Sequence, residues 1–172
     1  MRVGDPLAEP APDLGPLIDE KRKREVSALV AEALSAGARL VTRPREPMDG
    51  SYLGPALLAD VTPAMRICRE EVFGPAAAII PFTDEREAVA LANDTEMGLA
   101  AYVYTGRLDR AWRVCEALEA GIVGLNDALP SVAFAPMGGL KRSGLGREGG
   151  RAGLEEFRET TYVATELSGS GS

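Results

Sequence analysis

Histidine is absent from this sequence of 172 residues, and cysteine occurs only twice, at Cys68 and Cys115. The absence of histidine excludes Ser-His-Asp and Cys-His catalysis and removes the most common zinc ligand. Two isolated cysteines cannot form a CxxC site and do not suggest a disulfide framework. We therefore expect no metal site in this chain.

The sequence also lacks an excess of basic residues. Its formal net charge is −7 at pH 7, and phosphate binding requires a basic surface, so no nucleic-acid partner is expected. The one basic run, Lys21–Arg24, stands beside acidic residues. Lys21 and Glu25 have the spacing of a helical ion pair. A solvated helix face explains this run better than a nucleic-acid patch.

Long apolar runs are missing as well. No segment approaches the ~20 apolar residues that span a bilayer, so no membrane partner is expected. The N-terminus has no apolar segment of the kind found in secretory signals, which leaves the cytoplasm as the expected location. The composition, with 45% hydrophobic and 26% charged residues, is typical of a soluble globular protein.

Helical and strand-like patterns alternate along the chain and predict an α/β fold with a mainly parallel sheet flanked by helices. Helices are expected at residues 19–36, after Thr83, at 108–120 and at about 148–158. Strands are expected at residues 38–42, 52–61, 76–82, 101–105, 122–125 and 161–166. Pro55 favours an edge or bent position for the second of these strands.

Burial is expected along the apolar strand 76–82 and on one face of the helix at 108–120. That face carries Leu108, Ala111, Trp112, Cys115 and Leu118. Cys115 is therefore interpreted as a core residue.

The first motif that could carry chemistry is Arg69-Glu70-Glu71-Val72-Phe73-Gly74-Pro75, between two predicted strands. Gly74 and Pro75 fix a sharp turn that can aim Glu71 and Phe73 in one direction. A carboxylate can accept hydrogen bonds from a vicinal diol, and an aromatic face can orient a flat ring. The alternative is that the glutamates are solvated and the phenylalanine belongs to the core.

The second motif is the glycine-rich run from Ala135 to Glu148, which continues into Gly149. Residues 144–149 match GxGxxG literally, and Glu166 ends the next predicted strand. A dinucleotide fingerprint must follow directly on a buried strand, and residues 137–143 contain no apolar run. We interpret the segment as a tight loop before the last helix, with Arg147 and Glu148 available for ion pairs.

Together and in this order, the two motifs resemble the C-terminal third of NAD(P)-dependent aldehyde dehydrogenases. The resemblance covers about residues 2–167. It implies a partial catalytic domain at residues 1–160 and an oligomerisation strand at 161–167. The end of the chain, residues 168–172, consists of serine and glycine and is expected to be a disordered tail.

The resemblance also implies site residues. Glu71 matches the glutamate that accepts hydrogen bonds from the nicotinamide ribose, and Phe73 matches the aromatic residue against the nicotinamide of NAD or NADP. The loop after Asn126 matches the wall of the substrate tunnel. Ser131 matches a position that helps to hold the substrate carboxylate in succinate-semialdehyde dehydrogenases, the most similar branch. An ordinary loop serine is the alternative for Ser131.

Two departures from the family pattern affect the expected chemistry. Met137 stands where most relatives have phenylalanine, and its softer side chain puts a preference for aromatic aldehydes in doubt. Cys68 lies between Arg66 and Arg69, which could lower its pKa, but its position is not catalytic in relatives. The family's nucleophilic cysteine, general base and oxyanion-hole asparagine lie upstream of everything present here.

Two functions are therefore compatible with the sequence. In the first, the chain is part of an aldehyde dehydrogenase and is inactive alone. The intact enzyme acts on an aldehyde substrate, and the chain assembles either as a homo-oligomer or with an N-terminal partner chain. In the second, it is a non-catalytic binding or assembly module with the same fold. A glutamate and a phenylalanine retained at the cofactor positions favour the first.

Overall fold

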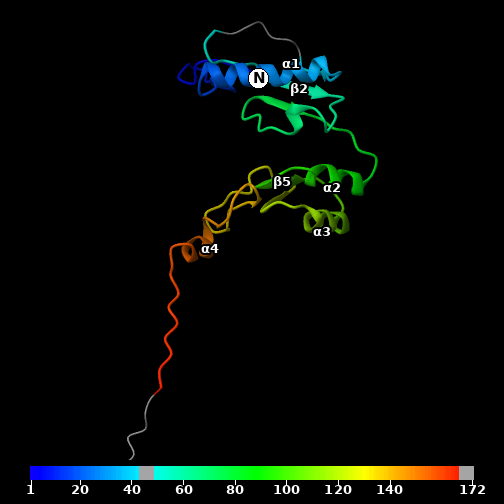
Figure 1. Ribbon diagram of the computed structural model, residues 1–172. Helices are drawn as coiled ribbons and strands as arrows, with labels where there is room; N and C mark the ends of the chain where they lie inside the picture. Colours follow the sequence, from blue (N-terminus) through cyan, green and yellow to red (C-terminus); the bar gives the residue numbers. More distant parts are fainter. Residues whose placement is uncertain (43–48, 167–172) are drawn as a thin grey trace, which may run out of the picture. The chain divides into compact units, whose positions relative to one another are not determined.

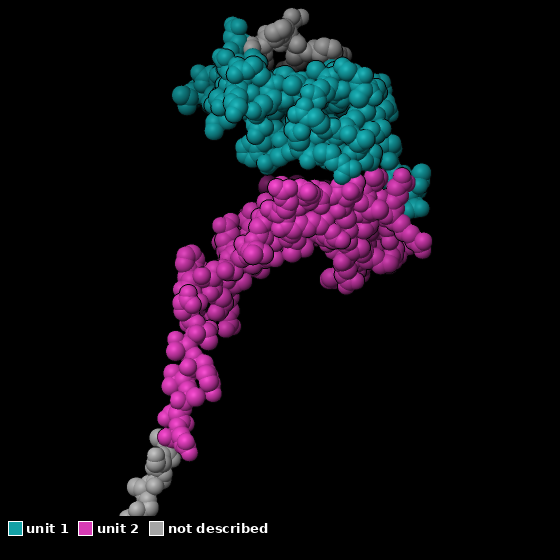
Figure 2. Space-filling view, in the orientation of Figure 1, with its two compact units in different colours: residues 1–84 teal, residues 85–172 magenta. Residues whose placement is uncertain are grey.

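A computed structural model describes residues 1–42 and 49–166. The chain divides into two compact units, residues 1–84 and 85–172 (Figure 2). None of the helices in the described ranges combines the length and apolar character that a bilayer span requires. The tail expected to be disordered, residues 168–172, lies outside the described residues, as does most of the predicted loop at 43–51.

The first unit is organised around helix α1 (Glu20–Ser35), which lies against a small sheet (Figure 1). The Asp19 side chain accepts a hydrogen bond from the backbone N–H of Arg22 at 2.7 Å and caps the helix. The buried residues Val26, Leu29 and Ala33 recur at helical spacing. Gly37, with φ of 104°, ends the helix in a left-handed conformation. The predicted helix at 19–36 is confirmed.

The sheet of the first unit has the order β1-β2-β3, with strands Arg39–Leu40, Ala56–Ala59 and Ala76–Ala78. Strand β1 is antiparallel to β2, and β3 is parallel to it. β2 is therefore central, and the edge position predicted from Pro55 is wrong. Pro55 precedes the strand, so its missing N–H removes no hydrogen bond from the ladder.

The core of the first unit lies between α1, β2 and the 3₁₀ helix η1 (Arg66–Cys68). Its buried members are Leu29, Ala33, Ala38, Leu58, Val61, Met65 and Ile67. Strand β3 is shorter than the predicted 76–82, and Ala77 and Ala78 are exposed rather than buried. In the described residues β3 pairs on one side only, which leaves its outer edge uncovered.

The second unit contains helices α2 (Glu85–Asn93), α3 (Leu108–Ala117) and α4 (Gly150–Glu155). Strands β5 (Ala100–Val103) and β6 (Ile122–Leu125) are parallel. Strands β4 (Met97–Gly98) and β7 (Leu140–Lys141) are antiparallel. The one mainly parallel sheet that was predicted is thus replaced in the described chain by three small sheets, of which one is mixed, one antiparallel and one parallel.

The apolar face predicted for helix 108–120 is wider than the buried one. Ala111 is buried and Cys115 is half-buried, whereas Leu108 and Trp112 are 72% and 65% exposed. The helix packs against β5 and β6 with Ala111 and Cys115, which are four residues apart. Leu108 and Trp112 remain largely exposed to solvent.

The end of the described chain differs from the predicted helix and strand. Helix α4 is six residues long rather than spanning about 148–158. Residues 159–166, orange to red in Figure 1, form neither helix nor strand in the described single chain. Their pairing with another subunit stays a prediction.

Candidate functional site

The two adjacent glutamates of the first motif have different environments. Glu70 accepts hydrogen bonds from Arg66 at 2.6 and 3.0 Å, and Arg66 also donates to Glu32 at 2.7 Å. The hydrogen bonds from Arg66 lower the pKa of the Glu70 carboxyl. Glu71 is exposed, and its carboxylate makes no hydrogen bond or ion pair with the described residues. Glu70 is therefore structural, and Glu71 is available to a ligand.

Phe73 is held in an unusual conformation. Its φ of 41° lies in the left-handed region, and its side chain is 71% exposed. For a non-glycine residue this backbone conformation costs about 1–2 kcal/mol. Because the ring is mostly exposed, its burial contributes little stabilisation to offset this cost. The conformation is therefore imposed by the surrounding turn.

The turn is anchored by its backbone. A Cβ added to Gly74 would lie 2.7 Å from Cγ2 of Val26 in α1, so this glycine is needed for close packing. The carbonyl of Pro75 accepts a hydrogen bond from the N–H of Ala56 at 2.8 Å. The turn is thus fixed between α1 and β2, while the side chains of Glu71 and Phe73 remain outside the core.

A pocket of about 700 Å³ adjoins this turn within the first unit. Its lining is almost wholly apolar and consists of Met1, Leu14, Thr42, Pro55, Ala56, Leu57, Gly74, Pro75, Ala76 and Ala77. The one hydroxyl, that of Thr42, accepts a hydrogen bond from the N–H of Leu57 at 3.3 Å. The pocket offers an apolar surface at Gly74 and Pro75, the residues that follow Glu71 and Phe73 in the turn.

The loop after β6 begins with a structural asparagine. Asn126 has φ of 52°, and its amide donates to the carbonyl of Thr105 at 3.0 Å and accepts from the N–H of Thr105 at 2.9 Å. These bonds tie together the carboxyl ends of β5 and β6. The side chain of Asn126 is therefore occupied, and ligand contacts are left to the residues that follow it.

The structure brings the two predicted substrate residues together. The Ser131 hydroxyl lies 3.6 Å from the sulfur of Met137 and can donate to it. The backbone of Met137 pairs with that of Glu148 through hydrogen bonds of 2.7 and 2.8 Å. Ser131 is exposed and Met137 half-buried. Since a thioether is a weak acceptor, the Ser131 hydroxyl can exchange this contact for a stronger acceptor at small cost.

The glycine-rich loop packs backbone against backbone. A Cβ on Gly121 would lie 1.8 Å from the carbonyl oxygen of Gly138, and one on Gly138 would lie 2.6 Å from Cδ of Arg147. Arg147 donates to the carbonyls of Gly139 and Gly146 at 3.0 and 2.7 Å. Arg147 was interpreted as available for an ion pair, but toward the described residues its guanidinium braces the loop instead.

The loop does not have the geometry of a dinucleotide fingerprint. The strand before it, β7, has two residues, and the helix after it, α4, has six. A pocket of about 480 Å³ lies against the loop within the second unit. It is lined by Leu99, Met137, Gly138, Gly139, Ser143, Leu145, Gly146, Arg147, Glu148 and Glu156.

Neither cysteine has the environment of a nucleophile. Burial raises the pKa of the Cys68 thiol, and the charge of Arg69 opposes this only in part. Cys68 packs against the core of the first unit. Cys115 is half-buried on α3. In the described residues, no group of three or more cysteine, aspartate and glutamate side chains could hold a metal ion.

The sequence singled out Glu71, Phe73, Ser131 and Met137, whose roles stay predictions, and it missed the role of Arg66. The four-residue spacing of Arg66 and Glu70 was a readable signal for their ion pair. Glu71 and Phe73 belong to the first unit, whereas Ser131 and Met137 belong to the second. Ser131 and Met137 contact each other, whereas Glu71 and Phe73 share only the turn that carries them.

Residues 1–163 match the aldehyde dehydrogenase family. The chain is 45% identical over 168 residues to the NADP⁺-dependent succinate-semialdehyde dehydrogenase of Escherichia coli, covering 97% of the chain and 35% of that enzyme. Among solved structures, the succinate-semialdehyde dehydrogenase of Burkholderia pseudomallei has a TM-score of 0.87 and 46% identity, covering 91% of this chain and 33% of that one.

A Mycobacterium tuberculosis aldehyde dehydrogenase solved with NAD⁺ has a TM-score of 0.82 and 40% identity, covering 91% and 33% of the two chains. The chain thus spans about a third of the length of these relatives.

Proposed function

Because this chain belongs to the aldehyde dehydrogenase family, we propose that it forms the C-terminal part of an NAD(P)-dependent enzyme that oxidises a semialdehyde to a carboxylic acid. NAD(P), when bound, supplies the acceptor for the hydride that leaves the substrate. The residues of this chain bind and orient the cofactor and the far end of the substrate. The cytoplasm is the proposed location.

The free carboxylate of Glu71 carries this proposal. Glu71 is exposed and unbonded among the described residues, beside a Glu70 that is fully engaged by Arg66. Glu71 accepts hydrogen bonds from the ribose diol, and the exposed ring of Phe73 packs against the nicotinamide. An assembly module would require neither a free carboxylate here nor a phenylalanine in a left-handed conformation. The catalytic part is therefore favoured over a non-catalytic module.

A carboxylate-bearing aldehyde is favoured by the second site. Ser131 can donate a hydrogen bond to a carboxylate once its weak contact to the Met137 sulfur is released. Met137 forms a flexible wall without an aromatic face. Several proteins of similar sequence are semialdehyde dehydrogenases, which agrees with such a substrate.

A chimaeric enzyme tests the proposal. The matching last third of the Escherichia coli relative is replaced by this chain, and reduction of NAD(P) by succinate semialdehyde is measured. Glu71→Gln should raise the KM for the cofactor about tenfold, because hydrogen bonds to a charged group contribute about 1.5–3 kcal/mol. Glu70→Gln is the matched control and should leave that KM unchanged. Equal KM values for both variants would contradict the role of Glu71.

The chain alone should oxidise no aldehyde. The nucleophile and general base of the family have no match in this chain, and loss of either removes most of the rate. The measurement is NAD(P)H formation by the purified chain with and without Cys68→Ala. Formation above background that Cys68→Ala abolishes would make Cys68 a nucleophile and refute this expectation.

A further inference from the structure

Lys141 joins three separate segments of the second unit. Its ammonium donates to the carbonyls of Asn93 and Thr95 at 2.8 and 3.1 Å and lies 2.5 Å from the carboxylate of Glu119. The side chain retains 24% of its exposure. An ammonium has three N–H donors, so these contacts use all of them. No sequence signal marks this residue, because its carbonyl partners lie 48 and 46 positions away.

Lys141 binds at the C-terminal end of helix α2, where a positive charge is favoured. Helix α2 ends at Asn93 and has no basic residue in its last turn, although its final carbonyls have no partner within the helix. A positive charge at this end is favoured by the helix dipole. The Asn93 side chain donates to the carbonyl of Ala117 and accepts from the N–H of Glu119. Lys141 therefore binds at a joint where the ends of α2 and α3 already meet.

The backbone of Lys141 has a conformation that is unusual for a lysine. Its φ of 53° lies in the left-handed region, where glycine or asparagine would be less strained. Lys141 pairs with Met97 and Leu140 with Gly98 in the short β4–β7 ladder. A two-residue ladder is weak by itself. The three contacts of the ammonium compensate for the strain and hold β7 in place.

The consequence concerns Met137. Only residues 138–140 separate it from Lys141, and the backbone of Gly138 packs directly on Gly121. At its other side Met137 is paired with Glu148. We propose that Lys141 is a positioning residue that fixes the loop carrying Met137, and with it the Ser131–Met137 substrate wall. The assignment of that wall rests on the proposed function, whereas the anchoring of the loop does not.

The anchoring is tested in the chain itself by Lys141→Gln, with the neighbouring Arg142→Gln as matched control. Arg142 also pairs with one carboxylate, that of Glu96. In methyl-labelled protein, Lys141→Gln should shift or broaden the methionine methyl signals of Met97 and Met137. The signal of Met65, in the first unit, should not move. Arg142→Gln should leave the Met137 signal in place.

Hydrogen exchange separates positioning from general loss of stability. In Lys141→Gln, exchange of the Met137 and Glu148 N–H groups should accelerate at least tenfold, whereas the β5–β6 pair keeps its protection. Equal acceleration in both places, or an unchanged Met137 signal, would overturn the proposal.

In the chimaeric enzyme, Lys141→Gln should raise the KM for succinate semialdehyde several-fold and leave kcat and the KM for the cofactor little changed. Lys141→Arg, which keeps the charge, should recover part of the substrate KM. A loss confined to kcat would refute the link between Lys141 and substrate binding. An inactive wild-type chimaera, together with the expected methyl shifts, would refute the proposed function and leave the anchoring by Lys141 standing.

Discussion

Phe73 illustrates how a single residue can be placed for a ligand rather than for the fold. Its backbone is strained and its ring is mostly exposed. Ile67, six residues earlier, is 5% exposed and belongs to the core of the first unit. Substitution should therefore cost much less stability at Phe73 than at Ile67.

Phe73→Gly should leave the stability of the first unit nearly unchanged. Relief of about 1–2 kcal/mol of left-handed strain offsets the larger entropy that glycine loses on folding, about 1 kcal/mol, and the small burial of the ring. Ile67→Ala should lower the free energy of unfolding by about 2–5 kcal/mol. Urea unfolding of both variants measures this. A large loss in Phe73→Gly would mean that the ring stabilises the fold.

At the same scale, the sequence predicted residues whose contacts are local and failed where the contact is distant. The pairing of Arg66 with Glu70 follows from their four-residue spacing and could have been predicted. The loop after Asn126 was interpreted as a wall of the substrate tunnel, but nothing in the sequence indicated that the Asn126 amide is used by Thr105, 21 positions away. A side chain with both donor and acceptor groups satisfies whichever backbone comes within reach, and spacing alone does not reveal this.

At the scale of elements, the turn before β3 depends on the close approach of two chains. Gly74→Ala would place a methyl group 2.7 Å from Cγ2 of Val26, which is fully buried. We expect a loss of about 1–3 kcal/mol, typical of overpacking. Gly106→Ala is the matched control, because nothing lies within 4 Å of its added Cβ. Thermal unfolding of both variants gives the difference, and equal midpoints would contradict the packing argument.

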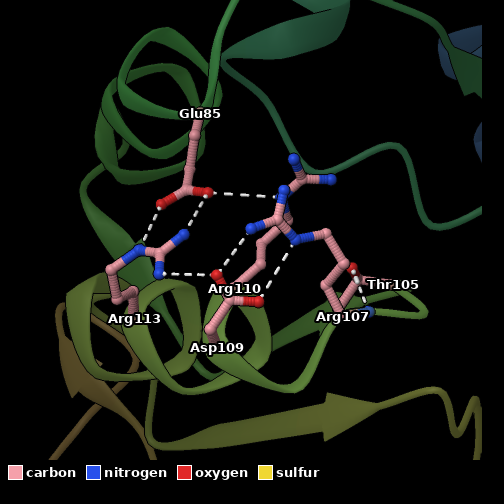
Figure 3. Close-up of polar contacts among 6 residues, drawn as sticks. All are labelled: Glu85, Thr105, Arg107, Asp109, Arg110 and Arg113. Carbon is pink, nitrogen blue, oxygen red and sulfur yellow. Dashed lines mark hydrogen bonds and ion pairs between the residues drawn. The ribbon is translucent and has the colours of Figure 1, made fainter.

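Helices α2 and α3 are joined by an ionic network around Arg113 (Figure 3). Arg113 donates to Glu85 of α2 at 3.0 and 3.2 Å and to Asp109 of α3 at 3.1 Å. Arg110 also donates to Glu85, and Arg107 to Asp109. Hydrogen bonds from Arg113 lower the pKa of Glu85, and those from Arg107 and Arg113 lower the pKa of Asp109.

The network should make the second unit sensitive to acid. A carboxyl whose pKa is lowered by folding contributes its full stabilisation above the unfolded value, about 4, and loses it as the pH falls through the folded value. The thermal unfolding midpoint of the chain should therefore fall as the pH is lowered below about 4. In Arg113→Gln this fall should be less steep. Fluorescence of Trp112, the single tryptophan, reports on α3. Arg151→Gln is the control on an exposed ion pair, and parallel curves for wild type and Arg113→Gln would contradict the prediction.

The elements themselves were predictable where one stretch of sequence holds the signal. Helix α1 has its cap, its apolar stripe and its terminal glycine within residues 19–37. The central place of β2 and the mixed direction of the strands depend on pairings between distant segments. The exposure of Leu108 and Trp112 likewise depends on what packs against α3, which the 3.6-residue period does not specify.

At the scale of the whole molecule, burial is uneven between the two units. Of the nine buried hydrophobic residues in the described chain, only Ala111 belongs to the second unit. The same unit exposes Tyr102, Tyr104 and Trp112. A compact unit with so small a buried core gains little from the hydrophobic effect. Its exposed apolar residues are therefore suited to further contacts, as expected for a part of a larger enzyme.

The last segment contributes to this exposed surface and should drive self-association. Residues 159–166 form neither helix nor strand in the described chain, and Tyr162 and Val163 are 88% and 77% exposed. Aromatic and β-branched residues in this run favour strand pairing, and an unpaired strand invites addition to the sheet of another chain. We expect light scattering to find a dimer or larger species whose share rises with concentration.

Two variants distinguish strand pairing from non-specific association. Val163→Pro removes a ladder hydrogen bond and should shift the chain toward monomer, as should deletion of residues 162–172. Deletion of residues 168–172 alone is the control, because it leaves the apolar run intact, and it should not change the association. A concentration-independent monomer in the wild-type chain would refute the prediction. Association that survives Val163→Pro and the longer deletion would assign it to the exposed apolar residues elsewhere, among them Trp112 and Tyr104, rather than to this segment.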